Sequence, residues 1–208
     1  VGPLEWLNFS RTFDAVKLHY QEKDWWVDGF TSSVVRLHES QFNNSDWTDT
    51  QNNRRQLFSG VYFSTTALPV QTTDVYALHL HEEALAGSTD FVTLGSRMKG
   101  DPLKLAGWDY TLELAGQAGQ VRGQQLRAYA WHLEGGYNWL ETSWKPRLAL
   151  EYSHGSCDGN AADGKVGTFQ NLFPTNHPPY VFMDTMSWQN MHNLVLRLAA
   201  QPHAKVKT

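Results

Sequence analysis

Three arginines stand in the middle of segments in which polar and apolar residues alternate, and their chemistry is the most informative in the chain. Arg97, Arg147 and Arg197 each lie on the polar side of such a segment. A guanidinium is always charged, and its planar fork matches a carboxylate with two hydrogen bonds. If the polar side lines a water-filled space, these residues predict contact with anionic groups there.

Carboxylates share the same polar faces and leave a second interpretation open. Asp109, Glu113, Glu134 and Glu151 could pair with the arginines across strands and only stabilise the wall. Paired carboxylates such as Glu113 and Glu151 also serve glycoside hydrolysis. Carboxylates are common on any polar face, however, and the sequence has no Gly-x-Ser-x-Gly nucleophile pattern. We therefore expect no enzymatic activity.

Two groups of side chains could bind a metal, and both have a simpler interpretation. His79 and His81 are two residues apart, but no third ligand is fixed and no zinc spacing fits, so we expect polar histidines facing a lumen. A loop group lacks EF-hand spacing, so turn-forming side chains are expected in place of a Ca²⁺ site. Its members are Asp158, Asn160, Asp163 and Asp184. No cofactor is implied.

The elements that must position these residues are strands, because the recurrent hydrophobic period is two. No segment has the pattern of a long amphipathic helix, so the predicted fold class is all-β with nine strands, and a tenth could start at Ala204–Lys207. The clearest alternation runs through Val16–Tyr20, Trp108–Leu114, Leu148–Tyr152 and Leu194–Leu198; the other segments are Trp25–Arg36, Gln56–Thr65, Thr73–Glu82, Phe91–Lys99 and Gln125–Tyr137.

Connector lengths and strand lengths favour a membrane barrel. Counted up and down the strands, four short connectors fall at one end of the sheet and two long ones, Glu39–Asn53 and Gly155–Asn190, at the other, as in outer-membrane barrels. The segments are about nine to twelve residues long, close to what a tilted strand needs to cross the hydrocarbon layer. Aromatic residues near strand ends suit an interfacial girdle, although a β-sandwich core also uses them. These residues are Trp25, Trp26, Trp108, Tyr137, Trp139, Trp144 and Tyr152.

Composition excludes several other classes. The net charge of −4 and a pI near 6.1 give no reason to expect a nucleic-acid partner. Cys157 is the only cysteine, which excludes an internal disulfide framework and a multi-cysteine zinc site. The apolar runs are too short for a transmembrane helix, and the first residues do not have the pattern of a signal peptide.

One loop segment carries a family resemblance. Residues 167–177 read Gly-Thr-Phe-Gln-Asn-Leu-Phe-Pro-Thr-Asn-His and are followed by Tyr180 and Asp184. This stretch resembles the loop motif of the alginate export family of bacterial outer-membrane barrels. The segments Arg11–Leu18, Asp109–Gln117 and Asn193–Leu198 agree with the family in order. The motif residues are Phe169, Leu172, Phe173, Pro174, Thr175, Asn176, His177 and Asp184.

The resemblance implies a fold, a function and partners. Residues 1–208 would be a single β-barrel region, part of a larger barrel of about eighteen strands, since spanning sheets must close. The function implied is an outer-membrane channel for an anionic, alginate-like polysaccharide, with outer-membrane lipid as a further partner; partners in a secretion apparatus stay open. Its pore-lining residues would be Lys17, Arg97, Glu113, Arg147, Glu151 and Arg197, with His19, Lys99, Asp109 and Glu134 on the same faces.

Two positions depart from the family pattern, and one alternative function remains. Cys157 and Val181 stand where the family tends to have glycine, which often supplies a positive φ, so the local loop conformation could differ. The alternative is a soluble β-sandwich that binds or cleaves carbohydrate. The barrel and the sandwich differ in which face of the strands contacts water.

Overall fold

The protein is built from long antiparallel strands. The computed structural model describes residues 12–36, 44–45, 55–84, 87–160, 162–173 and 188–201. Within these ranges the long strands are β1 (Phe13–Gln21), β2 (Trp25–Arg36), β4 (Gln56–Thr65), β5 (Gln71–Glu82), β6 (Thr89–Gly100), β7 (Trp108–Val121), β8 (Gln124–Asn138), β9 (Arg147–Gly155) and β11 (Met191–Ala199). Two-residue strands β3 (Asn44–Ser45) and β10 (Lys165–Val166) complete the set.

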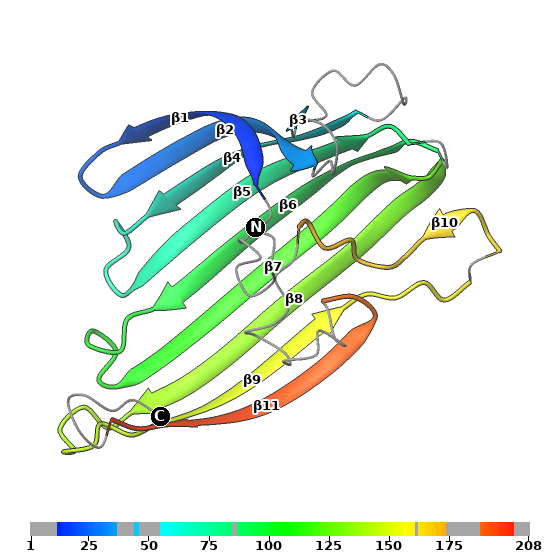
Figure 1. Cartoon of the computed structure of the whole chain (residues 1–208). Coiled ribbons are helices and arrows are strands. Elements are labelled where there is room, and N and C mark those ends of the chain that lie inside the picture. The colour runs from blue at the N-terminus through cyan, green and yellow to red at the C-terminus, as the bar shows by residue number, and fades with distance from the viewer. Residues whose placement is uncertain are drawn as a thin grey trace.

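The long strands form one curved sheet in the order β1-β2-β4-β5-β6-β7-β8-β9-β11 (Figure 1). Each pairs antiparallel with its neighbour along the chain, and β1 and β11 are the two edges of the described sheet. The prediction of an all-β antiparallel fold is confirmed, whereas a β-sandwich would require a second packed sheet. Among the described residues no helix has the length and apolar character needed to cross a membrane.

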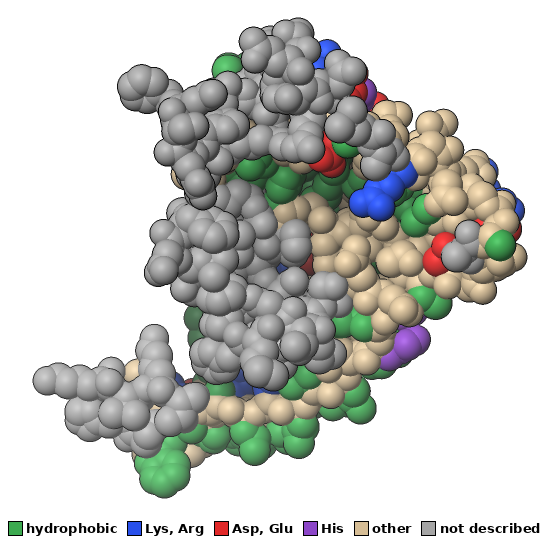
Figure 2. All heavy atoms as spheres, turned by 45° about the vertical axis from the view of Figure 1, so that its right-hand side comes forward, with side chains coloured by type: hydrophobic (Ala, Val, Ile, Leu, Met, Phe, Trp, Pro, Cys, Tyr) green, Lys and Arg blue, Asp and Glu red, His purple; other side chains and the backbone are tan. Residues whose placement is uncertain are grey.

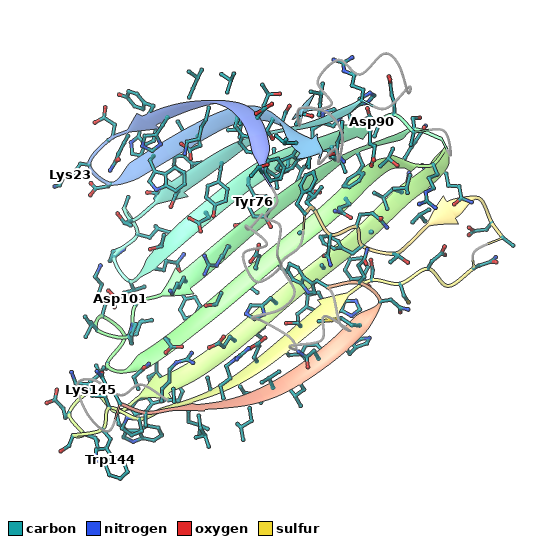
Figure 3. The ribbon with its side chains drawn as sticks, in the orientation of Figure 1. Lys23, Tyr76, Asp90, Asp101, Trp144 and Lys145 are labelled. Carbon is teal, nitrogen blue, oxygen red and sulfur yellow. The ribbon has the colours of Figure 1, made fainter. Side chains whose placement is uncertain are left out.

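Connectors alternate between the two ends of the sheet. Segments 22–24, 66–70, 101–107 and 139–146 join strands at one end, which we call the turn end; the opposite end is the loop end. Figure 3 places Lys23, Asp101 and Lys145 at the turn end and Asp90 at the loop end. One tight connector at the loop end is absent from the sequence prediction: Arg122 and Gly123, both with positive φ (51° and 80°), join β7 to β8. Such a pair matches the twist of a two-residue hairpin.

The sheet is strongly amphipathic. Registry places Leu148, Leu150, Leu194 and Leu196 on the convex face, where their exposed fractions run from 39% to 67%. Figure 2 shows hydrophobic side chains projecting along the lower outer surface. In the long described strands, the Asp, Glu, Lys and Arg side chains on the convex face are Asp14, Asp90 and Arg127. Those on the concave face, apart from the undescribed side chain of Arg36, are Lys17, Asp28, Asp74, Glu82, Arg97, Lys99, Asp109, Glu113, Glu134, Arg147, Glu151 and Arg197.

Aromatic residues form contacts at both ends of the convex face. Trp25 packs between Tyr20 and Phe63 near the turn end, with ring centroids 5.5 and 5.8 Å away. On the loop-end half of β9, Tyr152 packs against Trp131 of β8 at 4.8 Å. Amphipathic rings at these two levels suit the two interfaces of a bilayer.

Two sequence predictions about facing are wrong. Trp26 lies on the concave face, because the register pairs it with Ser64 and turns its neighbour Trp25 outward. His79 and His81 lie on the convex face with Val75 and therefore do not face the lumen. Both histidines bond to Asp90 of β6, at 3.1 and 2.7 Å, close to the loop end.

Candidate functional site

The concave face holds an open cavity of about 960 Å³ between the sheet and an inward-folded loop. Its walls come from β1, β2, β4, β5, β6 and β7, and its cover is residues 169–172 together with Trp188. Of the predicted pore-lining residues, Lys17, Arg97 and Glu113 line this cavity. Arg147, Glu151 and Arg197 lie on the same face but on β9 and β11, outside the cavity lining.

The motif loop folds into the hollow (Figure 1). Phe169 is buried against Phe91, Ala115, Leu126, Ala128 and Ala130, with Leu172 packed beside this cluster. The alanines leave the space that the Phe169 ring fills. Phe173 reaches the other side of the hollow, where it makes edge contacts with Phe13 and Phe58 at 5.1 Å. Its φ of 49° is unusual for a bulky residue and indicates that packing holds it in place. Pro174, Thr175, Asn176, His177 and Asp184 lie outside the described residues.

Gln117 of β7 clamps the loop to the wall. Its amide nitrogen donates to the carbonyl of Gln170 at 2.8 Å, and its amide oxygen accepts from the Gln170 backbone N–H at 2.7 Å. The same nitrogen also donates to Thr93 Oγ1 at 3.0 Å. Gln117 is only 5% exposed, so both backbone groups of Gln170 are satisfied by one buried side chain.

Replacing Gln117 by Leu is expected to detach the loop from the wall. The change leaves both backbone groups of Gln170 without a partner, at about 1–3 kcal/mol for each buried polar group. Hydrogen exchange of the peptide that contains residues 168–172 should become faster, while peptides of β7 and β8 keep their protection. Gln120→Leu, on the convex face of the same strand, is the matched control; equal exchange in both variants would contradict the clamp.

A second anchor stands where the loop leaves β9. The Ser156 hydroxyl donates to the carbonyl of Gly167 at 2.7 Å and accepts from the N–H of Tyr129 at 3.0 Å. A Cβ at Gly167 would meet the carbonyl oxygen of Cys157 at 2.6 Å, so the close approach requires glycine there. Cys157 itself does not have a positive φ. The cysteine that replaces the family's glycine is therefore accommodated without left-handed backbone; Val181 lies outside the described residues.

Arg147 is paired with two carboxylates and Arg197 with one. Arg147 donates through Nε and Nη2 to both oxygens of Asp109, at 2.8 and 2.6 Å, and also to Glu134. Arg197 donates through Nε to Glu151 at 2.5 Å. Arg147 on β9 is therefore paired with carboxylates on β7 and β8, and Arg197 on β11 with a carboxylate on β9.

Arg97 and Lys17 are bound less tightly. The closest approach of Arg97 to Asp74 is 3.8 Å, beyond hydrogen-bond distance, and 39% of its side chain is exposed. Lys17 reaches Asp28 at 2.9 Å but is 56% exposed, and His19 shares the same carboxylate at 2.5 Å. Both cations line the cavity and are partly exposed to solvent.

A row of aromatic rings lies on the concave wall and was not predicted from the sequence. Trp26, Tyr62 and Tyr76, on β2, β4 and β5, have ring planes within 12° of parallel, with centroids 5.4 and 5.8 Å apart. Tyr76 lies in the middle of the sheet (Figure 3) and donates from its hydroxyl to Glu113 at 2.8 Å. The alternation in β4 and β5 could have placed both tyrosines on this face, but their contact depends on strand register.

The loop group that resembled a Ca²⁺ site forms Asx turns. Asp158, Asn160 and Asp163 each accept a hydrogen bond from the backbone N–H two residues later, at 3.0–3.2 Å. This confirms the turn interpretation for these three residues, while Asp184 lies outside the described ones. In the described part of the chain, no group of three or more Asp, Glu, His or Cys side chains has a metal-binding arrangement.

Comparison with known protein families identifies the family of this chain. The sequence profile described as alginate export matches residues 1–208. The chain belongs to the alginate export family. This is a transport family of bacterial outer-membrane β-barrels, so the chain has a role in alginate export and its fold is the sheet of such a barrel. No curated protein and no solved structure gives a significant match.

Proposed function

We propose that the chain forms part of the wall of an outer-membrane channel that conducts an anionic polysaccharide. The observation that carries this proposal is the separation of side chains between the two faces of one sheet. Exposed leucines and valines occupy the convex face, whereas the concave face holds most of the charged residues and the cavity. An outward apolar band and a polar interior are the arrangement that a transmembrane barrel requires. The two edges β1 and β11 would then pair with further strands, because open edges are costly in lipid.

The charges of this wall indicate how an anion would be held. Carboxylates outnumber Lys and Arg on the concave face, so net charge alone does not attract an anion. Attraction has to arise locally, where cations are incompletely paired. Arg97 and Lys17 meet this condition in the cavity, and exposed Lys99 follows Arg97 on β6. Arg147 and Arg197 instead hold Asp109, Glu134 and Glu151 in a fixed network.

Because Arg97 and Lys17 are only partly paired, they can make weak and repeated contacts with an anionic polysaccharide that moves along the concave face. A conducting site must bind its solute firmly enough to admit it and weakly enough to release it. Arg97 lies beside Asp74 and opposite Glu113, so a uronate carboxylate would compete with protein carboxylates for the same guanidinium. Such competition limits the residence of each uronate unit.

The test is the ion preference of the full-length protein in a planar bilayer. Arg97→Glu is expected to shift the reversal potential under a salt gradient towards cation preference, because it reverses the charge that a pore ion can reach. Arg127→Glu makes the same change on the convex face and should leave the potential unchanged. Equal potentials for wild type and Arg97→Glu would show that Arg97 only pairs within the wall.

A further inference from the structure

The aromatic row has no evident purpose if the concave wall only holds water. Trp26, Tyr62 and Tyr76 all line the cavity, and none belongs to the buried cluster under Phe169. The same strands place other aromatic residues, Trp25 and Phe63, on the convex face. Aromatic side chains that line a hollow together with a few charged groups are characteristic of a ligand surface.

The row is held in a defined position. Tyr76 lies over Gly95, where a Cβ would approach its ring to 2.2 Å, and its hydroxyl is fixed by Glu113 on the strand beyond. Tyr62 is the direct cross-strand partner of Tyr76, with ring planes 6° from parallel. Trp26 follows at 12°, and His19 continues the row onto β1 at 5.9 Å. Four neighbouring strands therefore contribute to one continuous series of rings.

The direction of the row follows from barrel geometry. Tyr62 and Tyr76 are direct cross-strand partners, whereas Trp26 is a diagonal neighbour of Tyr62, so the rings follow one another across the strands. Strands of such barrels tilt by about 35–45° from the barrel axis. A row across β1, β2, β4 and β5 thus rises along the pore as it passes around the wall. A chain-like solute that moves through the pore would meet the rings one after another.

Charges flank the row on both sides. Lys17 bonds to Asp28, which is the cross-strand partner of Tyr62. Arg97 pairs across the sheet with Glu113, which accepts the hydroxyl of Tyr76. A pyranose ring carries apolar C–H faces and polar edges, and a uronate adds one carboxylate. The arrangement offers apolar ring surface for the faces, and cations with hydrogen-bonding carboxylates for the edges.

We propose that Trp26, Tyr62 and Tyr76 form a track for the sugar rings of a polyuronate, with Lys17 and Arg97 as contacts for its carboxylates. The inference rests on the proposed channel function and deepens it by assigning the solute-binding surface within the cavity. The rings would supply affinity for pyranoses in general, and the two cations the preference for uronates.

The experiment measures how long a short oligomannuronate blocks single-channel current through the full-length protein. Tyr62→Leu and Trp26→Ala are expected to shorten the blockades about threefold to tenfold, the range set by one aromatic contact. Tyr62→Phe keeps the ring and should retain the wild-type duration. Phe63→Leu and Trp25→Ala make matched changes on the convex face of the same strands and should leave the blockades unchanged.

A neutral malto-oligosaccharide of equal length separates the two parts of the proposal. Arg97→Gln should shorten blockades by the uronate oligomer and leave those by the neutral oligomer unchanged. If the blockades in Tyr62→Leu and Trp26→Ala lasted as long as in wild type, the aromatic track would be wrong, although the channel function would stand. Absence of blockade of the wild-type channel by the uronate oligomer would overturn both. Gly95→Val displaces the Tyr76 ring without removing an aromatic residue, and it should also shorten the blockades by the uronate oligomer.

Discussion

Replacing Arg147 by Ala is expected to lower the free energy of unfolding by about 3 kcal/mol, the lower end of the cost of breaking a buried ion pair. The lower end applies because the Arg147 side chain is still 24% exposed. Its removal leaves Asp109 and Glu134 without the cation that both contact, and Glu151 lies opposite Glu134 on the next strand. Denaturant unfolding of the full-length protein in detergent micelles measures the change.

Neutralising Asp109 and Glu134 tests whether their unpaired charges cause the loss of stability. Adding Asp109→Asn and Glu134→Gln to Arg147→Ala should recover most of the lost stability, because the unpaired charges are then gone. Arg127→Ala, which removes an arginine from the convex face, should stay within about 0.5 kcal/mol of wild type. An unchanged unfolding midpoint for Arg147→Ala would mean that the network does not stabilise the wall.

Replacing Leu150 by Arg is expected to cost about 2–4 kcal/mol if the site lies near the bilayer midplane. Leu150 lies in the middle of β9 on the convex face, is 53% exposed and pairs with Leu196 of β11. In lipid, a guanidinium at this depth loses its hydration, whereas on a water-exposed surface the same change would cost almost nothing. Unfolding of the full-length protein from lipid vesicles measures the difference.

The control for this prediction is an arginine on the same face nearer the end of a strand. Leu198 lies on the same face one residue from the turn end of β11 and is 77% exposed. Arg at this position should cost only about 0–1 kcal/mol, since it can reach the interface. If Leu150→Arg and Leu198→Arg were equally mild, the convex face would not be in contact with lipid.

Much of the fold could be predicted because one face of the sheet is largely apolar and the other carries most of the charged residues. An outward residue such as Leu150 is apolar and its neighbour Glu151 is charged, so the alternation is visible in the sequence. The bounds of β2 and β4 follow from this pattern residue by residue. The pattern fails near strand ends, where polar and aromatic residues are allowed on both faces. This explains why the histidines at 79 and 81 were assigned to the wrong face, and why Trp26 was counted among the girdle residues.

The interior could not be predicted to the same depth, because its contacts join residues far apart in the chain. Arg147 contacts Asp109 from 38 residues away, and Gln117 holds Gln170 across 53 residues. Nothing in the local sequence around Phe169 shows that it packs against Ala115 and Ala128. The aromatic row likewise depends on the register of β4 and β5. Each of these contacts requires the strand order and the path of the loop.

The central claim is that polyuronate passes along the concave face, and release of a labelled oligomannuronate from liposomes tests it most directly. Thr72 lines the cavity, and its neighbour Thr73 points to the convex face. In full-length protein with Cys157→Ser, a bulky water-soluble thiol reagent should block release through the Thr72→Cys variant and leave release through Thr73→Cys unaffected. Equal release from both variants after labelling, or no release from wild-type liposomes, would contradict the account.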